Sequence, residues 1–319
     1  YNIDGYVIPK NDEFFGEYIP DQSDRLKYIT NFTGSFGFAL ILKTKNYLFV
    51  DGRYTLQAKN QCGKSFIVIT VPQKMPYNFL KNKNFSVGYD PKLISRKMLN
   101  AFFSKSKCKL VPIKDNLIDN IWKRKLKKNK GSFYILPKRS VGNYYKYKIN
   151  KVVSHIKKKG ADFQFITASE NNAWLLNIRG NDAEYSPIPA SYILINKNRK
   201  IILFCNLDKI PPTLKRNMSD VKFLEIDKTN KILSGINGTK FLIDSSTCSV
   251  FFEKVISKNN KIINFQDPIY DFKSIKSKKE IKNIQKSHIY DGVALTKYLF
   301  WLKKNFLKKN ITEIGGAQK

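Results

Sequence analysis

Hydrophobic and polar positions follow the same order in the two halves of the chain. Residues 38–42 and 47–50 are apolar and flank a short polar break, and residues 192–195 and 201–204 repeat this arrangement. Two short apolar runs around such a break predict a β-hairpin. We therefore expect one hairpin in each half.

A related segment precedes each hairpin. Residues 28–35 read YITNFTGS and residues 174–181 read WLLNIRGN, so that Asn-x-x-Gly recurs at Asn31 and Asn177. We interpret Asn-x-x-Gly as a junction between a strand and a turn, where Gly takes a positive φ and Asn caps the backbone. A repeat about 150 residues long exceeds any solenoid unit, and it predicts two tandem domains of one ancestry.

The remaining elements follow from short apolar runs and amphipathic stretches. In the first half we expect strands at residues 6–8, 66–69 and 110–113, and helices at residues 56–62, 95–105 and up to Trp122. In the second half we expect a helix at residues 141–158, a stop at Gly160 and a strand at residues 163–167. The boundary between the halves should lie in the Lys-, Asn- and Gly-rich run 123–131.

A third piece is predicted from residue 274 onwards. Ser277 and Glu280 have the spacing of a capping box, and apolar residues then recur at helical intervals up to residue 302. A long amphipathic helix that leads into an unfinished segment suggests a chain cut short at this end. The first residues include no initiator Met, which suggests the same for the other end.

The chain is strongly basic, with a net charge of +33 from 58 Lys and Arg and 25 Asp and Glu. Only eight of the basic residues are Arg, the side chain that nucleic-acid recognition favours. The Lys-rich runs at residues 123–130 and 157–159 lack the interleaved aromatic residues of a single-strand binder, and we interpret them as solvated faces. We expect no nucleic-acid partner. No apolar run of about 18 residues occurs, so we also expect no membrane partner.

Few residues are suited to catalysis. The two histidines, His155 and His288, fall on predicted helices, and we interpret both as ordinary helix residues rather than ligands. No phosphate loop, dinucleotide fingerprint or HExxH motif occurs. The cysteines show no CxxC spacing, which favours free buried thiols in a reducing cytosol over a disulfide or a zinc site. They are Cys62, Cys108, Cys205 and Cys248.

One element breaks the duplication. After the first hairpin, residues 51–54 read DGRY, whereas the equivalent residues 206–209 read NLDK. Arg53 should project from the end of a strand, where α/β folds commonly place ligand contacts. Its guanidinium could clamp a carboxylate or carbonyl of a ligand. Equally, it could form an ion pair within the domain, with Asp51 or Asp24.

Several motifs, in the same order along nearly the whole chain, resemble aminopeptidase P. This family comprises the Xaa-Pro aminopeptidases of the creatinase and prolidase group, and the resemblance is to the three-domain cytosolic type. The motifs are residues 28–37 (YITNFTGSFG), 49–58 (FVDGRYTLQA), 87–95 (VGYDPKLIS), 116–122 (NLIDNIW), 173–192 (AWLLNIRGNDAEYSPIPASY) and 275–301 (IKSKKEIKNIQKSHIYDGVALTKYLFW).

The resemblance implies an α/β fold in three pieces. Residues 1–138 and 139–273 would be two tandem creatinase N-terminal-like domains, each a mixed β-sheet flanked by helices. Residues 274–319 would be the linker and first helix of a truncated α+β pita-bread metallopeptidase domain. In that domain of the family, two Asp, one His and two Glu hold two divalent metal ions, expected to be Mn²⁺. The resemblance ends before those ligands, so it assigns no metal residue and no bound metal to this chain.

The function implied for the full-length protein is hydrolysis of the N-terminal residue from peptides with proline in second position. This chain would gate access for short proline-containing peptides, and Arg53 would reach the substrate from the first domain. The resemblance further implies an enzyme of the cytoplasm and a homodimer through the missing catalytic domain, while the chain alone would be inactive. The alternative is a duplicated binding or scaffold module without peptidase activity.

Overall fold

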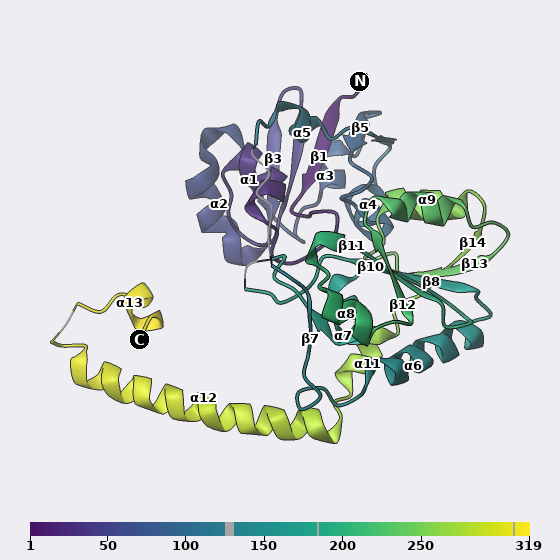
Figure 1. Ribbon diagram of the computed structural model, residues 1–319. Helices are drawn as coiled ribbons and strands as arrows, with labels where there is room; N and C mark the ends of the chain where they lie inside the picture. Colours follow the sequence, from purple (N-terminus) through teal and green to yellow (C-terminus); the bar gives the residue numbers. More distant parts are fainter. Residues whose placement is uncertain (125–130, 184, 309) are drawn as a thin grey trace. The chain divides into compact units, whose positions relative to one another are not determined.

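The computed structural model describes residues 1–124, 131–183, 185–308 and 310–319. Most of the predicted boundary between the halves, residues 123–131, therefore lies outside the described residues. The chain divides into two compact units (Figure 1). The first comprises Tyr1–Ile135 with Tyr145–Tyr270, and the second comprises Leu136–Tyr144 with Asp271–Lys319. No helix among the described residues is both long enough and apolar enough to cross a membrane.

The first half of the chain forms a six-stranded mixed sheet in the order β4-β3-β2-β1-β5-β6. Its strands are β1 Gly5–Pro9, β2 Phe38–Leu42, β3 Asn46–Val50, β4 Ile67–Thr70, β5 Ser86–Tyr89 and β6 Lys109–Pro112. The predicted hairpin is confirmed, because β2 and β3 pair antiparallel with Phe38 opposite Phe49. β1 also pairs antiparallel with β2, whereas β4, β5 and β6 join by parallel pairing.

The second half repeats this sheet strand for strand, in the order β12-β11-β10-β8-β13-β14. Its strands are β8 Phe163–Ile166, β10 Tyr192–Asn196, β11 Ile201–Cys205, β12 Val221–Glu225, β13 Lys240–Ile243 and β14 Lys261–Asn264. The second predicted hairpin is confirmed in β10 and β11, and the remaining pairings have the same directions as in the first sheet. Both sheets are visible in Figure 1. The duplication read from the sequence is therefore structural.

Helices flank both sheets. Those of the first half are α1 Arg25–Thr30, α2 Thr55–Cys62, α3 Pro76–Leu80, α4 Arg96–Phe103 and α5 Leu117–Ile121. Those of the second half are α6 Tyr145–Lys158, α7 Ser169–Leu176, α8 Pro212–Asn217, α9 Lys228–Ser234, α10 Val250–Ser257 and α11 Ile269–Ser274. Two further helices, α12 Lys278–Asn305 and α13 Glu313–Ala317, belong to the second unit. A short pair of strands, β7 Tyr134–Ile135 and β9 Ile178–Arg179, joins the chain that leaves the first half to the second.

The helix expected at residues 141–158 begins only at Tyr145. The reason is that the preceding segment, Leu136–Tyr144, packs against the start of α12 within the second unit. There Lys279 Nζ donates to the carbonyl of Lys138 at 2.7 Å, and a Cβ on Gly142 would overlap Ser277. The capping box is confirmed, since Ser277 and Glu280 exchange side-chain and backbone hydrogen bonds at the start of α12.

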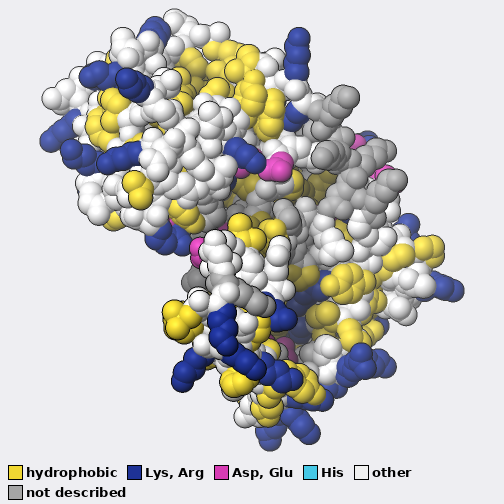
Figure 2. Space-filling model, turned by 90° about the vertical axis from the view of Figure 1, so that its left-hand side faces the viewer, with side chains coloured by type: hydrophobic (Ala, Val, Ile, Leu, Met, Phe, Trp, Pro, Cys, Tyr) yellow, Lys and Arg dark blue, Asp and Glu magenta, His cyan; other side chains and the backbone are white. Residues whose placement is uncertain are grey.

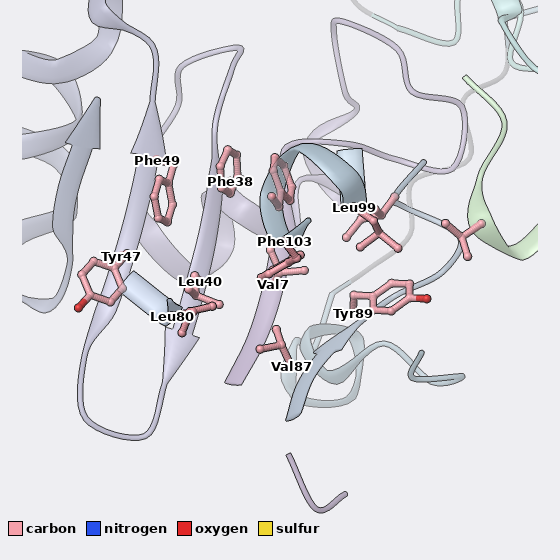
Figure 3. Packing of buried hydrophobic residues seen from close by; sticks show 13 residues of the cluster. Val7, Phe38, Leu40, Tyr47, Phe49, Leu80, Val87, Tyr89, Leu99 and Phe103 are labelled. Atoms are coloured by element: carbon pink, nitrogen blue, oxygen red, sulfur yellow. The ribbon is translucent and has the colours of Figure 1, made fainter. Parts of the chain in front are cut away.

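The core of the first domain lies on both faces of its sheet, because successive side chains of a strand point to opposite sides. On one face, Phe38 and Leu40 pack with α3 and α4, and Phe38 stacks on Phe102 with ring centroids 4.0 Å apart. Figure 3 shows this cluster, with Phe38 and Phe49 side by side on neighbouring strands. Ala39 points to the other face, which α1, α2 and α5 cover. Each fully buried large side chain stabilises the domain by roughly 1.5–3 kcal/mol.

Equivalent segments of the two domains meet at a pseudo-two-fold seam, formed by residues 91–97 and 245–251. Ser95 and Ser249 are the N-caps of α4 and α10, and they form a β-bridge with each other. The reciprocal backbone bonds run from Phe251 N to Pro91 O at 2.9 Å and from Lys97 N to Ser245 O at 3.3 Å. The copies therefore associate through the same surface, as the subunits of an isologous dimer do.

Each domain also inserts an apolar side chain into the core of the other. Val250 lies in the apolar cluster of the first domain, and Phe14 packs against that of the second. The ring of Phe14 stacks on Tyr192 with centroids 5.1 Å apart, and the Tyr192 hydroxyl donates to the carbonyl of Glu13 at 2.6 Å. The segment that follows β1 is thereby fixed against the second domain.

The interpretation of Asn-x-x-Gly is wrong in both copies. α1 ends at Asn31 and α7 ends at Asn177, and it is the asparagine that takes the left-handed conformation, with φ values of 60° and 57°. The motif is thus a helix C-terminus, where Asn is the usual substitute for Gly. Gly34 and Gly180 have ordinary φ values and are required by crowding, because a Cβ on Gly34 would overlap the ring of Phe32.

We expect Gly34→Ala to lower the free energy of unfolding by about 1–3 kcal/mol, because Phe32 is fully buried and its ring has no room to move. Urea denaturation of both proteins measures the change. Gly52→Ala is the matched control, because no atom lies within 4 Å of the Cβ it would add. Equal loss of stability in the two variants would contradict this account of Gly34.

A buried carboxylate follows the same strand in each domain. Asp90 comes directly after β5 and Asp244 directly after β13. In the first domain Asn116 Nδ2 donates to Asp90 at 2.8 Å, while in the second the backbone N–H of Asp267 donates to Asp244 at 2.9 Å. The donor to this carboxylate is therefore a side-chain amide in the first domain and a backbone N–H in the second.

Asp267 is buried among neutral donors. Its carboxylate accepts hydrogen bonds from Gln164 at 3.0 Å, from Asn171 at 2.7 Å and from the backbone of Ile269 at 3.0 Å. Burial outweighs these bonds and raises the pKa of Asp267 to about 6, with a further contribution from the negative charge of Asp244.

We expect Asp267→Asn to make the protein less sensitive to pH between about 4 and 6. In this window native Asp267 keeps a proton that the unfolded chain has released, so the wild type loses stability as the pH rises. The stability of the variant relative to the wild type should increase by about 2–3 kcal/mol from pH 4 to pH 7. Urea denaturation at both pH values tests this, with the exposed Asp115→Asn as control. A relative stability that does not change with pH would contradict it.

Candidate functional site

Arg53 lies on a turn that both domains build in the same way. β3 ends at Val50, and the Asp51 side chain accepts the backbone N–H of Arg53 at 2.9 Å and caps a short 3₁₀ helix, Gly52–Tyr54. In the second domain Asn206 accepts the backbone N–H of Asp208 at 2.9 Å and caps an equivalent 3₁₀ helix, Leu207–Lys209. The fold therefore sets the turn, and the sequence alone decides that one copy displays Arg and the other Asp.

The Arg53 guanidinium is at the surface, with a side chain 72% exposed. Its Nη2 donates to Asp51 at 2.7 Å, and it lies 5.0 Å from the centroid of the Tyr54 ring. The Asp51 carboxylate, and after it Tyr54 and Glu17, raise the pKa of Arg53. Of the two ion pairs expected from the sequence, the one with Asp51 is present, whereas Asp24 pairs with Lys10.

The exposed Asp51–Arg53 pair leaves the guanidinium available to a ligand. Ion pairs in contact with water contribute little, because solvent screens them and both side chains must be held in place. Asp51 already orients the guanidinium of Arg53. The neighbouring Tyr54 ring is itself fixed, because its hydroxyl lies 2.9 Å from Ser35 Oγ. A carboxylate or carbonyl that approached Arg53 would meet a donor whose direction is set in advance.

A cavity of about 1180 Å³ lies between the two domains of the first unit, and we call it the interdomain cavity. Its walls come from the segment after β1, from residues 122 and 124, and from loops of the second domain. Of the residues that the structure describes, seven acidic ones line it but only two basic ones. The acidic residues are Asp12, Glu13, Glu17, Asp21, Glu170, Asp182 and Asp208, and the basic ones are Arg124 and Lys209.

The sequence analysis missed this cavity. A local signal was present, because residues 12–21 contain four acids and no Lys or Arg in a chain with a net charge of +33. The basic side chains, by contrast, are spread over the surface, and on the face shown in Figure 2 the Lys and Arg side chains form no single continuous patch.

The other candidates from the sequence have structural surroundings. His155 on α6 packs against Phe265 with ring centroids 5.1 Å apart, and His288 is exposed on α12. The cysteines are free thiols. Of these, Cys62, Cys205 and Cys248 are buried and Cys108 is half-buried. Among the described residues no group of three His, Cys, Asp or Glu side chains is placed to hold a metal ion. The described residues therefore do not fit a dinuclear metal centre.

The fold defines a tandem pair of one α/β domain. A family model of the creatinase/prolidase N-terminal domain matches residues 1–121, and a second model of the same description matches residues 123–280. Together they cover most of the chain. The chain belongs to the creatinase/prolidase N-terminal domain family.

The similarity to curated proteins extends over the full chain. A probable Xaa-Pro aminopeptidase P of Laccaria bicolor is 30% identical over 100% of this chain and 52% of its own length. Xaa-Pro aminopeptidase ApepP of Drosophila melanogaster is 30% identical over 99% of this chain and 54% of its own length. The chain thus spans about half the length of the curated relatives it matches.

A solved structure with the same fold is that of an X-prolyl aminopeptidase from Caenorhabditis elegans, described as a cytosolic enzyme with a di-nuclear active site. The TM-score is 0.90 at 24% identity, over 99% of this chain and 54% of that one. At this level of identity the likeness establishes the architecture of the chain.

Proposed function

We propose that this chain is the N-terminal part of an Xaa-Pro aminopeptidase, which hydrolyses the first peptide bond of peptides with proline in second position. The observation that carries the proposal is similarity over the whole chain, at about 30% identity, to proteins named Xaa-Pro aminopeptidase P. The catalytic centre would lie in a part of the protein outside this chain. It would hold two metal ions, expected to be Mn²⁺, and no step through them involves the described residues.

In this function the two domains form a wall beside the catalytic centre. The seam between residues 91–97 and 245–251 and the exchange of Val250 and Phe14 between the cores make that wall rigid. A rigid wall admits short peptides and excludes folded chains, so the chain would gate access by length. We further propose that the complete protein works in the cytoplasm and dimerises through its catalytic part.

Arg53 is the residue that we propose contacts the substrate. It is exposed, oriented by Asp51, and has no counterpart in the second domain, where Asp208 occupies the equivalent position. A duplicated turn that carries a different side chain in one copy is better explained by a ligand than by the fold. The guanidinium would donate to a carbonyl or carboxylate of the peptide and hold it for attack at the scissile bond.

We expect Arg53→Ala in the complete enzyme to lower kcat/KM at least about tenfold for an Xaa-Pro peptide, through the loss of a charge-assisted hydrogen bond. The fold should be unchanged, because the side chain is exposed. Arg216→Ala, an exposed arginine at the end of α8, is the matched control and should retain the activity of the wild type. Unaltered kinetics for Arg53→Ala would remove this residue from the substrate site.

We expect residues 1–319, purified and supplied with Mn²⁺, to release no amino acid from an Xaa-Pro peptide, because the described residues offer no cluster of metal ligands. Chromatography of the released amino acid measures this. Turnover that persists after repeated purification, and that a chelator abolishes, would mean that the chain holds a catalytic metal itself. That result would contradict the proposal that the catalytic centre lies outside this chain.

A further inference from the structure

We propose that Asp51 is a positioning residue for Arg53: its carboxylate holds the guanidinium toward the substrate and is not required by the turn on which both residues lie. This inference rests on the proposed function and deepens it, because it adds a second side chain to the place where the peptide would be held. Three observations support it: the geometry of the contact between Asp51 and Arg53, the equivalent turn of the second domain, and the fixed ring of Tyr54.

The Asp51 carboxylate binds one edge of the Arg53 guanidinium. Arg53 Nε donates to Oδ1 at 3.2 Å and Nη2 donates to Oδ2 at 2.7 Å, so two neighbouring hydrogen bonds fix the plane and the direction of the group. Oδ1 also accepts the backbone N–H of Arg53 at 2.9 Å. A bidentate pair of this kind sets geometry as well as energy. The carboxylate therefore orients both the side chain and the backbone of the same residue.

The opposite edge of the guanidinium is left for a ligand. A guanidinium has five N–H groups, and Asp51 takes one from Nε and one from Nη2. Nη1 donates to no residue in the described part of the chain, and the side chain is exposed. The N–H groups that remain on Nη1 and Nη2 can donate to a carbonyl or carboxylate oxygen. Asp51 thus determines which edge of Arg53 a peptide would meet.

The second domain shows that the turn does not need a carboxylate. Asn206 stands at the position of Asp51 and accepts the backbone N–H of Asp208 at 2.9 Å, the same distance as in the first domain. Both turns continue as 3₁₀ helices of three residues. Asn and Asp are about equally effective as caps. The turn therefore does not require the negative charge of Asp51, which within the described structure pairs with Arg53.

Stability does not explain the ion pair either. A pair at the surface contributes little to the free energy of unfolding, because water screens it and two side chains must be ordered. The side-chain hydrogen bonds from Arg53 lower the pKa of Asp51, so the carboxylate stays charged at neutral pH. A charge that is always present but hardly stabilises the fold is better explained by its effect on Arg53. It restricts the guanidinium before a peptide binds, and binding then costs less side-chain entropy.

Tyr54 supports the guanidinium from a second side. The centroid of its ring lies 5.0 Å from Arg53 Cζ, and its hydroxyl is 2.9 Å from Ser35 Oγ. In the second domain Lys209 stands at the position of Tyr54, and it is buried and pairs with Asp182. The carboxylate and the ring therefore occur at this turn only in the copy that carries the arginine, as expected if both serve to hold it.

The test is the kinetics of Asp51→Asn in the complete enzyme, with an Xaa-Pro peptide as substrate. Asn keeps the cap, as Asn206 does, and removes the charge that holds Arg53. We expect kcat/KM to fall about three- to tenfold, mainly through KM, because a freely rotating guanidinium binds the peptide less well. The midpoint of urea unfolding should stay within about 0.2 M of the wild type. Asp115→Asn removes the same charge from an exposed position outside the turn and, as the matched control, should have wild-type kinetics.

A double-mutant cycle determines whether Asp51 acts through Arg53. If it does, Asp51→Asn should change kcat/KM less than about twofold in a protein that already carries Arg53→Ala. Two independent contributions would instead multiply. A turn that lost stability would lower kcat/KM in both backgrounds, so the cycle separates a positioning role from a structural one.

Three results would overturn the proposal. Asp51→Asn keeps wild-type kinetics, or it lowers KM, or its effect is as large in the Arg53→Ala background as in the wild type. A lower KM would mean that the carboxylate masks the charge of Arg53 instead of orienting it. All three results leave the wild type an active peptidase. Failure of the complete wild-type protein to hydrolyse any Xaa-Pro peptide would, in contrast, refute the proposed function and this inference with it.

Discussion

The backbone hydrogen bonds between residues 91–97 and 245–251 hold the two domains of the first unit together, and much else depends on them. Each domain has its own sheet, and its core comes from its own residues except where Val250 and Phe14 cross to the other domain. Without this seam, however, the interdomain cavity would lose one of its walls, because its acids come from both domains. These hydrogen bonds therefore hold in place a surface to which both domains contribute side chains.

At the turn after each hairpin, the two copies differ in a side chain that the fold leaves free. The turn after the hairpin is capped in the same way by Asp51 and Asn206, yet it presents Arg53 in one domain and Asp208 in the other. Backbone geometry at these turns is needed for each domain to close, so it is retained. The exposed side chain at the third position of the turn is not needed for closure. It is positive in the first domain, as Arg53, and negative in the second, as Asp208.

Much of the fold could be predicted from the sequence, because it is encoded locally. Two apolar runs around a polar break are sufficient to predict each of the hairpins β2–β3 and β10–β11. The spacing of Ser277 and Glu280 is sufficient to predict the start of α12. The error at Asn31 and Asn177 has a physical cause: Asn and Gly both tolerate positive φ, and the motif contains both. Only the crowding around Phe32, which comes from the packed structure, explains the glycine.

The candidate site was only partly predictable for a related reason. Arg53 stood out as a candidate because it breaks a repeat, whereas the interdomain cavity joins acids that are distant in the sequence, such as Asp12, Glu170 and Asp208. Their convergence follows from the packing of Phe14 against Tyr192, which no local pattern encodes. The excess of acids in residues 12–21 was the one visible sign of it.

The pairing of Ser95 with Ser249 has a consequence for the electrostatics of the seam. Both serines are N-caps, so the positive ends of two helix dipoles, those of α4 and α10, point at one place. Glu253 lies in the first turn of α10 and accepts Arg96 from the first turn of α4 at 3.1 Å, which sets a full negative charge against these partial positive ones. Because Glu253 also pairs with the full positive charge of Arg96, an ion pair joins the two helix N-termini, and it breaks the symmetry of the duplication where two like poles would otherwise face each other.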